Sequence, residues 1–346
     1  MTMRKSVLGV TLAAGMVLAA PAAKAAETWQ MQSTFPGTLV QLGTAGQWIA
    51  QRITLLTNGK VTVEFQNPGA VVPALQTFDA VSSGAVKAGW STPGYWAGKV
   101  PALQFFSSVP FGPEAGEYLA WMKFGGGEKL MDELYEKHNI KSLLCGAFAP
   151  EASGWFRREI KTVDDLKGLK MRFFGLGAKV MEKMGVSTQL LAGGDIFPAL
   201  ERGTIDATEF SMPALDLNLG FFQVAKHYYF PGWHQQATLF DLMINLDAWE
   251  KLDELTQLQI STACQANVAR TFAEGEAIQF DAIKQIKEKG VTIHKWPKEI
   301  LDAFQKAWGD VLKEESAKDA DFDRVAKAYL AFRENYKVWN ELAFLR

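Results

Sequence analysis

A run of alternating strands and short helices between residues 168 and 210 limits the fold more than any other part of the sequence. The pattern predicts strands at 169–173, 186–191 and 205–208, with helices at 178–184 and 196–202 between them. Strands that alternate with helices form parallel sheets, and ligands bind beyond the carboxyl ends of such strands. We therefore expect an α/β fold with a ligand cleft beside this stretch.

Two charged residues stand at the ends of these strands. Arg172 is near the end of the first strand, and Glu209 follows the third. A guanidinium is a rigid fork of donors that suits a carboxylate or a phosphate, whereas a carboxylate pairs with a cation or a donor. The spacing fits a binding cleft and fits a surface ion pair equally well, so both interpretations stay open at this point.

The first residues predict export. Arg4 and Lys5 precede an apolar run at 7–20, and Ala23-Lys24-Ala25 has the small-x-small form of a secretory cleavage site. The apolar run is too short to cross a bilayer comfortably. We expect residues 1–25 to be a signal peptide and the mature protein to be exported.

N-terminal sequencing of the exported protein tests this expectation. The mature chain should begin close after Ala25. A periplasmic form that retains Met1 would contradict it.

Composition limits the function classes. The chain is 48% hydrophobic and 21% charged with a net charge of −2, which suits a globular protein and favours neither nucleic acid nor an anionic membrane surface. The two cysteines, Cys145 and Cys264, lie far apart in apolar patterns. We expect free buried thiols rather than a bridge, although an oxidising compartment permits one.

The C-terminal third is predicted to be helical. The pattern indicates helices at 255–289, 298–317 and 322–344. The first would measure roughly 50 Å if unbroken, because a helix rises about 1.5 Å per residue. A helix of that length can cross two lobes, and together with connecting strands it suits a hinge.

The sequence contains none of the common catalytic motifs that would indicate an enzyme. The sequence has no HExxH, CxxC or GxSxG, and the triplet at 125–127 lacks the lysine of a phosphate loop. His234 stands beside aromatic residues, and we interpret it as a surface or packing residue. An enzyme hypothesis survives only as a metal-dependent reaction on a small acid that uses Glu151 or Glu209.

Tyr95 and Trp96 form an aromatic pair where a predicted strand gives way to a loop. An exposed aromatic ring there can stack on a ligand or hydrogen-bond to it. Packing in the core is the alternative, and it is favoured more for Trp96 than for Tyr95.

Five segments carry a resemblance to a known family. They are VPALQTFDAVSSG, PGYWAGKVPALQFFSSVPFG, GWFRREIKTVDDLKGLKMR, GGDIFPALERGTIDATE and YYFPGWH. In this order they resemble the extracytoplasmic solute-binding proteins of tripartite ATP-independent periplasmic (TRAP) transporters. The resemblance covers almost the whole mature chain. It is strongest to the subgroup that binds 2-oxo acids or lactate as metal–carboxylate complexes.

The resemblance implies two α/β lobes of the periplasmic-binding-protein fold, with hinge strands and a long helix spanning both lobes. Lobe 1 would comprise 26–148 and 238–252, and lobe 2 would comprise 149–237 and 253–346. A small organic acid such as pyruvate or lactate would bind between them and pass to membrane permease subunits. The resemblance also implies a homodimer through the C-terminal helices.

The family's binding positions fall on particular residues of this chain. The carboxylate-binding arginine falls on Arg172, and the aromatic loop matches at Tyr95 and Trp96. The metal-ligand positions fall on Glu151, on Glu209 and on the backbone carbonyl of the next residue, Phe210.

Three positions depart from the subgroup's pattern. Glu151 stands where glutamine is usual, Phe210 where tryptophan is usual, and Gln235, which is also expected to be a metal ligand, where an acidic residue is usual. The exchange of Glu and Gln preserves the formal charge of the cavity. Two carboxylates with oxygen donors favour Ca²⁺ over Na⁺ and do not predict zinc. A ligand-sensing domain with the same fold is the competing non-enzymatic hypothesis.

Overall fold

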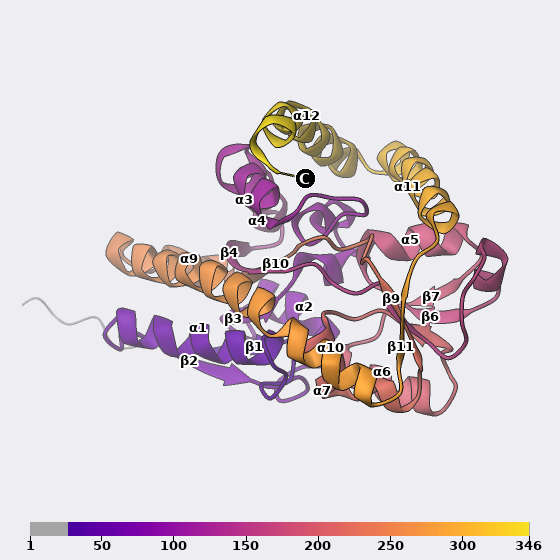
Figure 1. The fold of residues 1–346 in the computed structure, drawn as a ribbon. Helices are drawn as coiled ribbons and strands as arrows, with labels where there is room; N and C mark the ends of the chain where they lie inside the picture. Colours follow the sequence, from indigo (N-terminus) through magenta and orange to yellow (C-terminus); the bar gives the residue numbers. More distant parts are fainter. Residues whose placement is uncertain (1–26, 346) are drawn as a thin grey trace, which may run out of the picture.

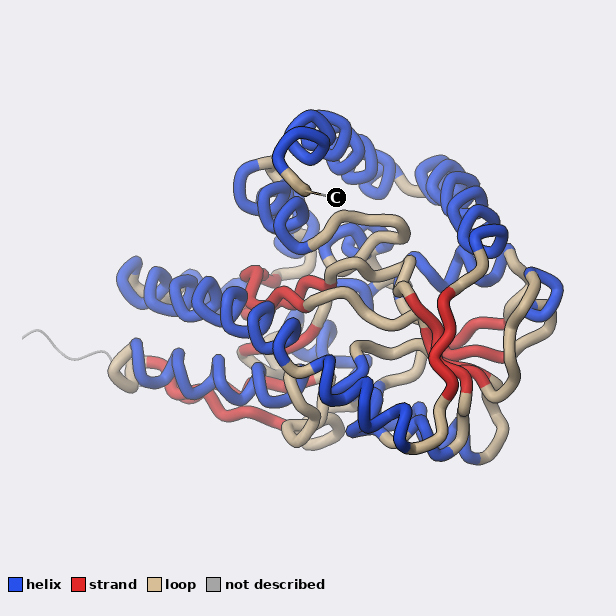
Figure 2. Tube along the Cα trace, viewed as in Figure 1, coloured by secondary structure: helices blue, strands red, loops and turns tan. Residues whose placement is uncertain are grey.

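The computed structural model describes residues 27–345, and the predicted signal peptide at 1–25 lies outside the described residues. Two sheets form the centre of the described chain (Figures 1 and 2). The first has the order β2-β1-β3-β10-β4, and the second has the order β11-β9-β5-β8-β6-β7. The expected α/β class is confirmed.

The first sheet is mixed. Its strands are β1 (Glu27–Ser33), β2 (Val61–Gln66), β3 (Ala88–Ser91), β4 (Ile140–Phe148) and β10 (Thr238–Asn245). Strand β1 pairs in parallel with β2 and β3, whereas β10 is antiparallel to both β3 and β4. All eight residues of β10 are buried, so this strand forms the middle of the core.

The second sheet contains the alternating strands and helices of residues 168–210. Its strands are β5 (Gly154–Phe156), β6 (Lys170–Arg172), β7 (Ser187–Gln189), β8 (Ala207–Thr208), β9 (His227–Phe230) and β11 (Thr292–Lys295). Strands β6, β7 and β8 are parallel, as predicted, with β6 between the other two. All three are shorter than the pattern indicates, and they bring the ends of β6 and β8 side by side.

Helices surround both sheets. They are α1 (Leu42–Leu56), α2 (Thr77–Ser82), α3 (Ala115–Phe124), α4 (Gly127–Glu136), α5 (Gly175–Lys183), α6 (Gly193–Glu201), α7 (Pro213–Leu219), α8 (Leu246–Glu250), α9 (Glu254–Ala277), α10 (Gln279–Glu288), α11 (Lys298–Lys318) and α12 (Ala320–Ala343). Helix α11 packs against α5, while α12 returns to pack against α3. No helix of the described residues is both long and apolar enough to span a membrane.

The long helix predicted at 255–289 is broken. Helix α9 ends at Ala277 and α10 begins at Gln279. The Gln279 side chain donates to the Gly275 carbonyl at 2.8 Å and accepts from the Ala214 amide at 3.0 Å. The side chain thus occupies the carbonyl that the Gln279 amide would use in an unbroken helix. Figure 1 shows α9 beside the first sheet and α10 continuing beside α7.

Cys145 and Cys264 are bonded to each other, so the expectation of free thiols is wrong. Cys145 lies in β4 and Cys264 in α9, which packs directly on β4. Asn267, one turn further along α9, donates to the Cys145 carbonyl at 2.8 Å. The packing of α9 on the sheet brings together two residues that are 119 positions apart in sequence.

The chain crosses between the two sheets three times. Residues 149–153 lead from β4 to β5, residues 231–237 lead from β9 back to β10, and α9 with α10 makes the third crossing. This arrangement fits the predicted division into two lobes, whose boundaries stay a prediction. The first two crossings we call the hinge segments.

Removing the disulfide should lower the free energy of unfolding by about 3–5 kcal/mol, because the bond closes a long loop in the unfolded chain. Chemical denaturation of a double variant, Cys145→Ala with Cys264→Ala, measures this. The double variant should also unfold identically with and without reductant. A wild-type protein no more stable than the variant would contradict the prediction.

Candidate functional site

The two hinge segments run side by side. The Glu151 amide donates to the Gln235 carbonyl at 3.1 Å, and the Gly232 amide donates to the Glu151 carbonyl at 3.1 Å. A side chain at Gly232 would clash, since an added Cβ would lie 2.2 Å from that carbonyl oxygen. The backbone pairing therefore fixes Glu151 and Gln235 next to each other at the junction of the two sheets.

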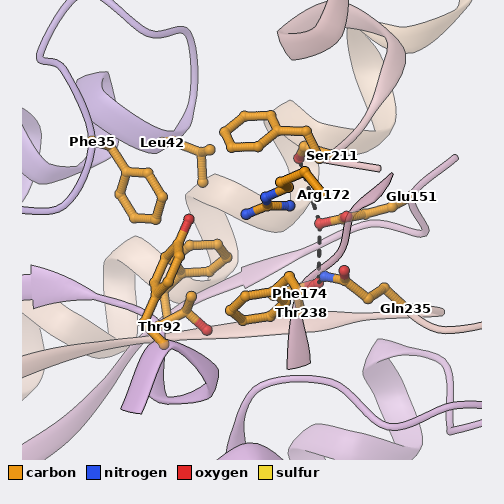
Figure 3. A pocket seen from close by; sticks show the side chains of 12 residues that line it. Phe35, Leu42, Thr92, Glu151, Arg172, Phe174, Ser211, Gln235 and Thr238 are labelled. Carbon is orange, nitrogen blue, oxygen red and sulfur yellow. Dashed lines mark hydrogen bonds between the residues drawn. The ribbon is translucent and has the colours of Figure 1, made fainter. Parts of the chain in front are cut away.

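A small pocket lies at this junction (Figure 3). Segments of the first sheet, segments of the second sheet and both hinge segments contribute to it. Its lining residues are Phe35, Leu42, Thr92, Tyr95, Glu151, Arg172, Phe174, Phe210, Ser211, Gln235, Thr238 and Phe240. The cavity volume is about 20 Å³, counted as the space that the centre of a water-sized sphere can occupy. One water molecule needs about 10–15 Å³ on the same measure. Only a very small ligand fits without separation of the two sides.

Arg172 and Glu209 form a buried ion pair. Arg172 Nη1 donates to Glu209 Oε1 at 2.6 Å and to the Glu209 carbonyl at 3.0 Å, and Nε donates to the Leu191 carbonyl at 3.2 Å. The Phe174 amide also donates to Oε1, at 2.5 Å. The two residues are 1% and 0% exposed, so the surface ion pair that the sequence left open is excluded.

The pKa of Glu209 is lowered even though the residue is buried. Burial alone would raise it, but the Arg172 charge, His234 and the Phe174 amide together favour the carboxylate. Glu209 is therefore anionic and holds the guanidinium in place. Figure 3 shows the guanidinium directed into the pocket.

The pKa of Glu151 shifts in the opposite direction to that of Glu209. Its Oε1 accepts from Thr238 Oγ1 at 3.1 Å and from Ser211 Oγ at 3.4 Å. Burial raises the pKa of Glu151 well above its ordinary value, and the nearby Glu209 charge adds to the effect. The surroundings of the two carboxyls thus act in opposite directions: they favour the charged form of Glu209 and disfavour that of Glu151.

Several buried polar atoms at the site have no hydrogen-bond partner of good geometry among residues 27–345. Three are acceptor oxygens, Glu151 Oε2, Glu209 Oε2 and Gln235 Oε1. The others are the two ring nitrogens of His234, of which Nε2 faces Glu209 Oε2 at 3.5 Å. Ligand atoms of Glu151, Glu209 and His234 all lie within 4.8 Å of one another. Buried polar groups are normally satisfied, so a group of unpartnered acceptors at one place indicates a site for a cation.

The other predicted residues fall into two groups. Tyr95, Phe210 and Gln235 line the pocket with Arg172 and Glu151. Burial raises the pKa of the Tyr95 phenol to about 12, although the Arg172 charge acts against this, so Tyr95 keeps its proton. Trp96 instead lies in the core, with its ring centroid 5.5 Å from that of Phe78.

Sequence reasoning missed His234, Thr238 and Ser211. His234 is 1% exposed, and its Nε2 lies 3.5 Å from Glu209 Oε2. Thr238 Oγ1 connects Gln235 Nε2, at 2.8 Å, to Glu151. The available signal for His234 and the adjoining Thr238 was the segment FPGWHQQA at 230–237, which concentrates polar residues where the chain returns to the first sheet; Ser211 lies outside it.

Two sheets joined by hinge segments, with a polar pocket at their junction, define a two-lobed solute-binding protein that closes around its ligand. Residues 35–319 match the bacterial extracellular solute-binding proteins, family 7. The chain belongs to this family.

Relatives of high similarity agree with this assignment. A monocarboxylate 2-oxoacid-binding periplasmic protein from Nostoc sp. is 37% identical over 316 residues, which cover 91% of this chain and 86% of the relative. A TRAP transporter solute-binding protein from Bordetella bronchiseptica, a mixed-occupancy dimer with calcium and picolinate, is 36% identical with a TM-score of 0.89; the match covers 91% of this chain and 94% of that one. A TRAP solute-binding protein from Pseudoalteromonas atlantica with sodium and pyruvate is 32% identical with a TM-score of 0.88, covering 91% and 96%.

Breaking the ion pair from one side should be costly. Arg172→Met leaves the Glu209 charge buried without its partner, which typically costs about 3–5 kcal/mol of stability. Adding Glu209→Gln removes that charge, so the double variant should be more stable than Arg172→Met alone. Denaturant unfolding of the variants in metal-free buffer measures both effects. A cost below about 1 kcal/mol for Arg172→Met would show that the pair does not act as described.

Proposed function

We propose that this protein is the extracytoplasmic solute-binding component of a TRAP transporter, and that it captures a small 2-oxo or 2-hydroxy monocarboxylate, such as pyruvate or lactate, together with a metal ion. The observation that carries the proposal is the meeting of one buried arginine and several unpartnered acceptors in a single small pocket. The family and the ligands named for the relatives support it. The periplasm is the corresponding compartment.

Arg172 supplies the carboxylate contact. Its Nε and Nη1 are held by protein acceptors, which fixes the plane of the guanidinium. A carboxylate oxygen entering the pocket would meet a donor that is already oriented, so little side-chain entropy is lost on binding. The Tyr95 hydroxyl, which keeps its proton, is a second donor on the opposite wall.

The acceptors supply the cation contact. Glu151, Glu209 and the Phe210 carbonyl are the proposed oxygen ligands, with Gln235 as the fourth protein group. Without a cation, the Glu209 charge and the other oxygens would face the negatively charged oxygens of the acid and repel it. A 2-oxo or 2-hydroxy acid offers two adjacent oxygens to one ion, which completes the shell. Among ions that prefer oxygen, two carboxylates favour Ca²⁺ over Na⁺.

Aromatic and aliphatic side chains limit the size of the acid. Phe35, Leu42 and Phe240 lie on the side contributed by the first sheet, and Phe174 and Phe210 lie beside Arg172. These groups can contact a methyl group but offer no donor to a second carboxylate. The pocket therefore suits a monocarboxylate with a short side chain.

Two partners follow from this role. Permease subunits in the membrane would receive the acid. A second copy of the chain would cover the exposed apolar side chains near the end of α12, which include Val338, Trp339 and Leu342.

Acid and cation should bind only together. Protein stripped with a chelator should bind pyruvate at least about 100-fold more weakly, a change of about 2.7 kcal/mol, and adding Ca²⁺ should restore the affinity. Glu209→Gln should weaken the binding of both partners, because the coupling between two ligands is reciprocal. Isothermal titration calorimetry measures each affinity.

Arg172→Lys is the matched variant for the carboxylate contact. It keeps the charge but loses the planar fork, so it should weaken pyruvate binding more than Ca²⁺ binding. Full pyruvate affinity in stripped protein, with no metal found by elemental analysis, would contradict the joint site.

A further inference from the structure

Asp216 is a buried carboxyl near the acid site that neither the ion pair nor the cation contact uses. It lies on α7 and is 1% exposed. Burial raises the pKa of Asp216 to about 7, although hydrogen bonds from Trp155, Tyr228 and the backbone of Ser211 act to lower it. Burying a carboxyl costs free energy unless hydrogen bonds replace the lost water, so the groups that Asp216 holds indicate its role.

One oxygen of Asp216 accepts two hydrogen bonds from the second sheet. Trp155 Nε1 donates to Asp216 Oδ2 at 2.9 Å, and the Tyr228 hydroxyl donates to the same oxygen at 2.8 Å. Trp155 and Tyr228 are paired across strands β5 and β9, and their rings stack with centroids 4.0 Å apart. A single side chain thus attaches α7 to two neighbouring strands.

Helix α7 follows directly on the segment that carries part of the site. Only residues 210–212 separate Glu209 from the start of α7. The Met212 carbonyl accepts from the Asp216 amide at 3.0 Å, within the first turn of the helix. Because so few residues intervene, a shift of α7 would move this segment, including Phe210, with it.

Two other contacts hold the ends of the same segment. The Glu209 amide donates to the Arg172 carbonyl at 3.2 Å, which attaches the segment to β6. The Gln279 side chain accepts from the Ala214 amide at 3.0 Å, which attaches the start of α7 to α10. Neither contact sets the position of α7 against the sheet, whereas the two bonds of Asp216 do.

We propose that Asp216 is a positioning residue for acid binding. By holding Trp155 and Tyr228 it fixes α7, and α7 in turn fixes residues 209–212, which contribute to the pocket. Asp216 acts through this segment and does not itself line the pocket. The effect on affinity rests on the proposed function, but the positioning is a property of the ligand-free protein.

The charge of Asp216 is the alternative explanation for any effect on the site. This charge raises the pKa of Glu151, so it acts on the pocket over a distance as well. Two variants separate the two roles. Asp216→Leu keeps the approximate size but removes both carboxylate oxygens, whereas Asp216→Asn removes the charge and keeps an acceptor for Trp155 and Tyr228.

Hydrogen exchange followed by mass spectrometry tests the positioning in ligand-free protein. In Asp216→Leu the Trp155 and Tyr228 donors are buried without an acceptor, which favours local opening. Peptides covering 207–219 should exchange at least about 10-fold faster than in the wild type, and Asp216→Asn should restore most of the protection. Tyr228→Phe removes one of the two bonds and keeps the ring. It should give an intermediate rate, and it tests the same contact if Asp216→Leu does not fold.

Asp241→Leu is the matched control. Burial raises the pKa of Asp241 to about 7 as well, but this residue lies on β10 in the first sheet, where Ser142 Oγ donates to it at 3.0 Å. The control should lower the free energy of unfolding and leave exchange in 207–219 at the wild-type rate. Unchanged exchange of 207–219 in Asp216→Leu, or equally fast exchange in the control, would overturn the proposal.

Calorimetry with pyruvate and Ca²⁺ tests the consequence for binding. The affinity should fall at least about 10-fold in Asp216→Leu and return to within about threefold of the wild type in Asp216→Asn. Equal losses in the two variants would show that the charge acts instead, and would overturn the proposal. If the wild-type protein does not bind pyruvate with Ca²⁺, the proposed function fails, and the exchange rates still decide the role of Asp216.

Discussion

The buried pair of Arg172 and Glu209 is the interaction on which the site depends. It joins the carboxyl ends of two neighbouring parallel strands, β6 and β8, through the backbone as well as the side chains. Two charges that are almost fully buried are tolerated only when each is paired and hydrogen-bonded. Here the pairing leaves the guanidinium directed into the pocket and one Glu209 oxygen unpartnered. The same contact therefore prepares the site for an anion and for a cation.

The location of the remaining groups connects binding to the movement of the two sides. Glu151 and Gln235 lie on hinge segments that pair with each other, whereas Tyr95 and Phe240 belong to the first-sheet side and Arg172 to the second. An acid and an ion that contact all of these groups would stabilise the closed arrangement over an open one. The ligand would then drive closure because it makes more contacts in the closed arrangement than in the open one, as any ligand-driven change requires. In the proposed role, release to a permease would require only that the two sides separate.

The sequence predicted the parts of the site that depend on local pattern. Arg172 and Glu209 stand at strand ends, and the periodicity of residues 168–210 is enough to place them near each other. The disulfide, the break after α9 and the role of His234 depend on contacts between distant segments. Cys264 meets Cys145 only because α9 packs on β4, and the Gln279 side chain interrupts the helix because it also binds Ala214 on α7. His234 looked like a packing residue because nothing in FPGWHQQA shows that the hinge segment passes Glu209.

Native mass spectrometry of the protein as purified shows whether acid and metal are carried together. We expect a bound species whose added mass equals one small monocarboxylate plus one metal ion, and we expect both masses to disappear together on chelation. An acid that stays bound after the metal has been removed would contradict joint binding.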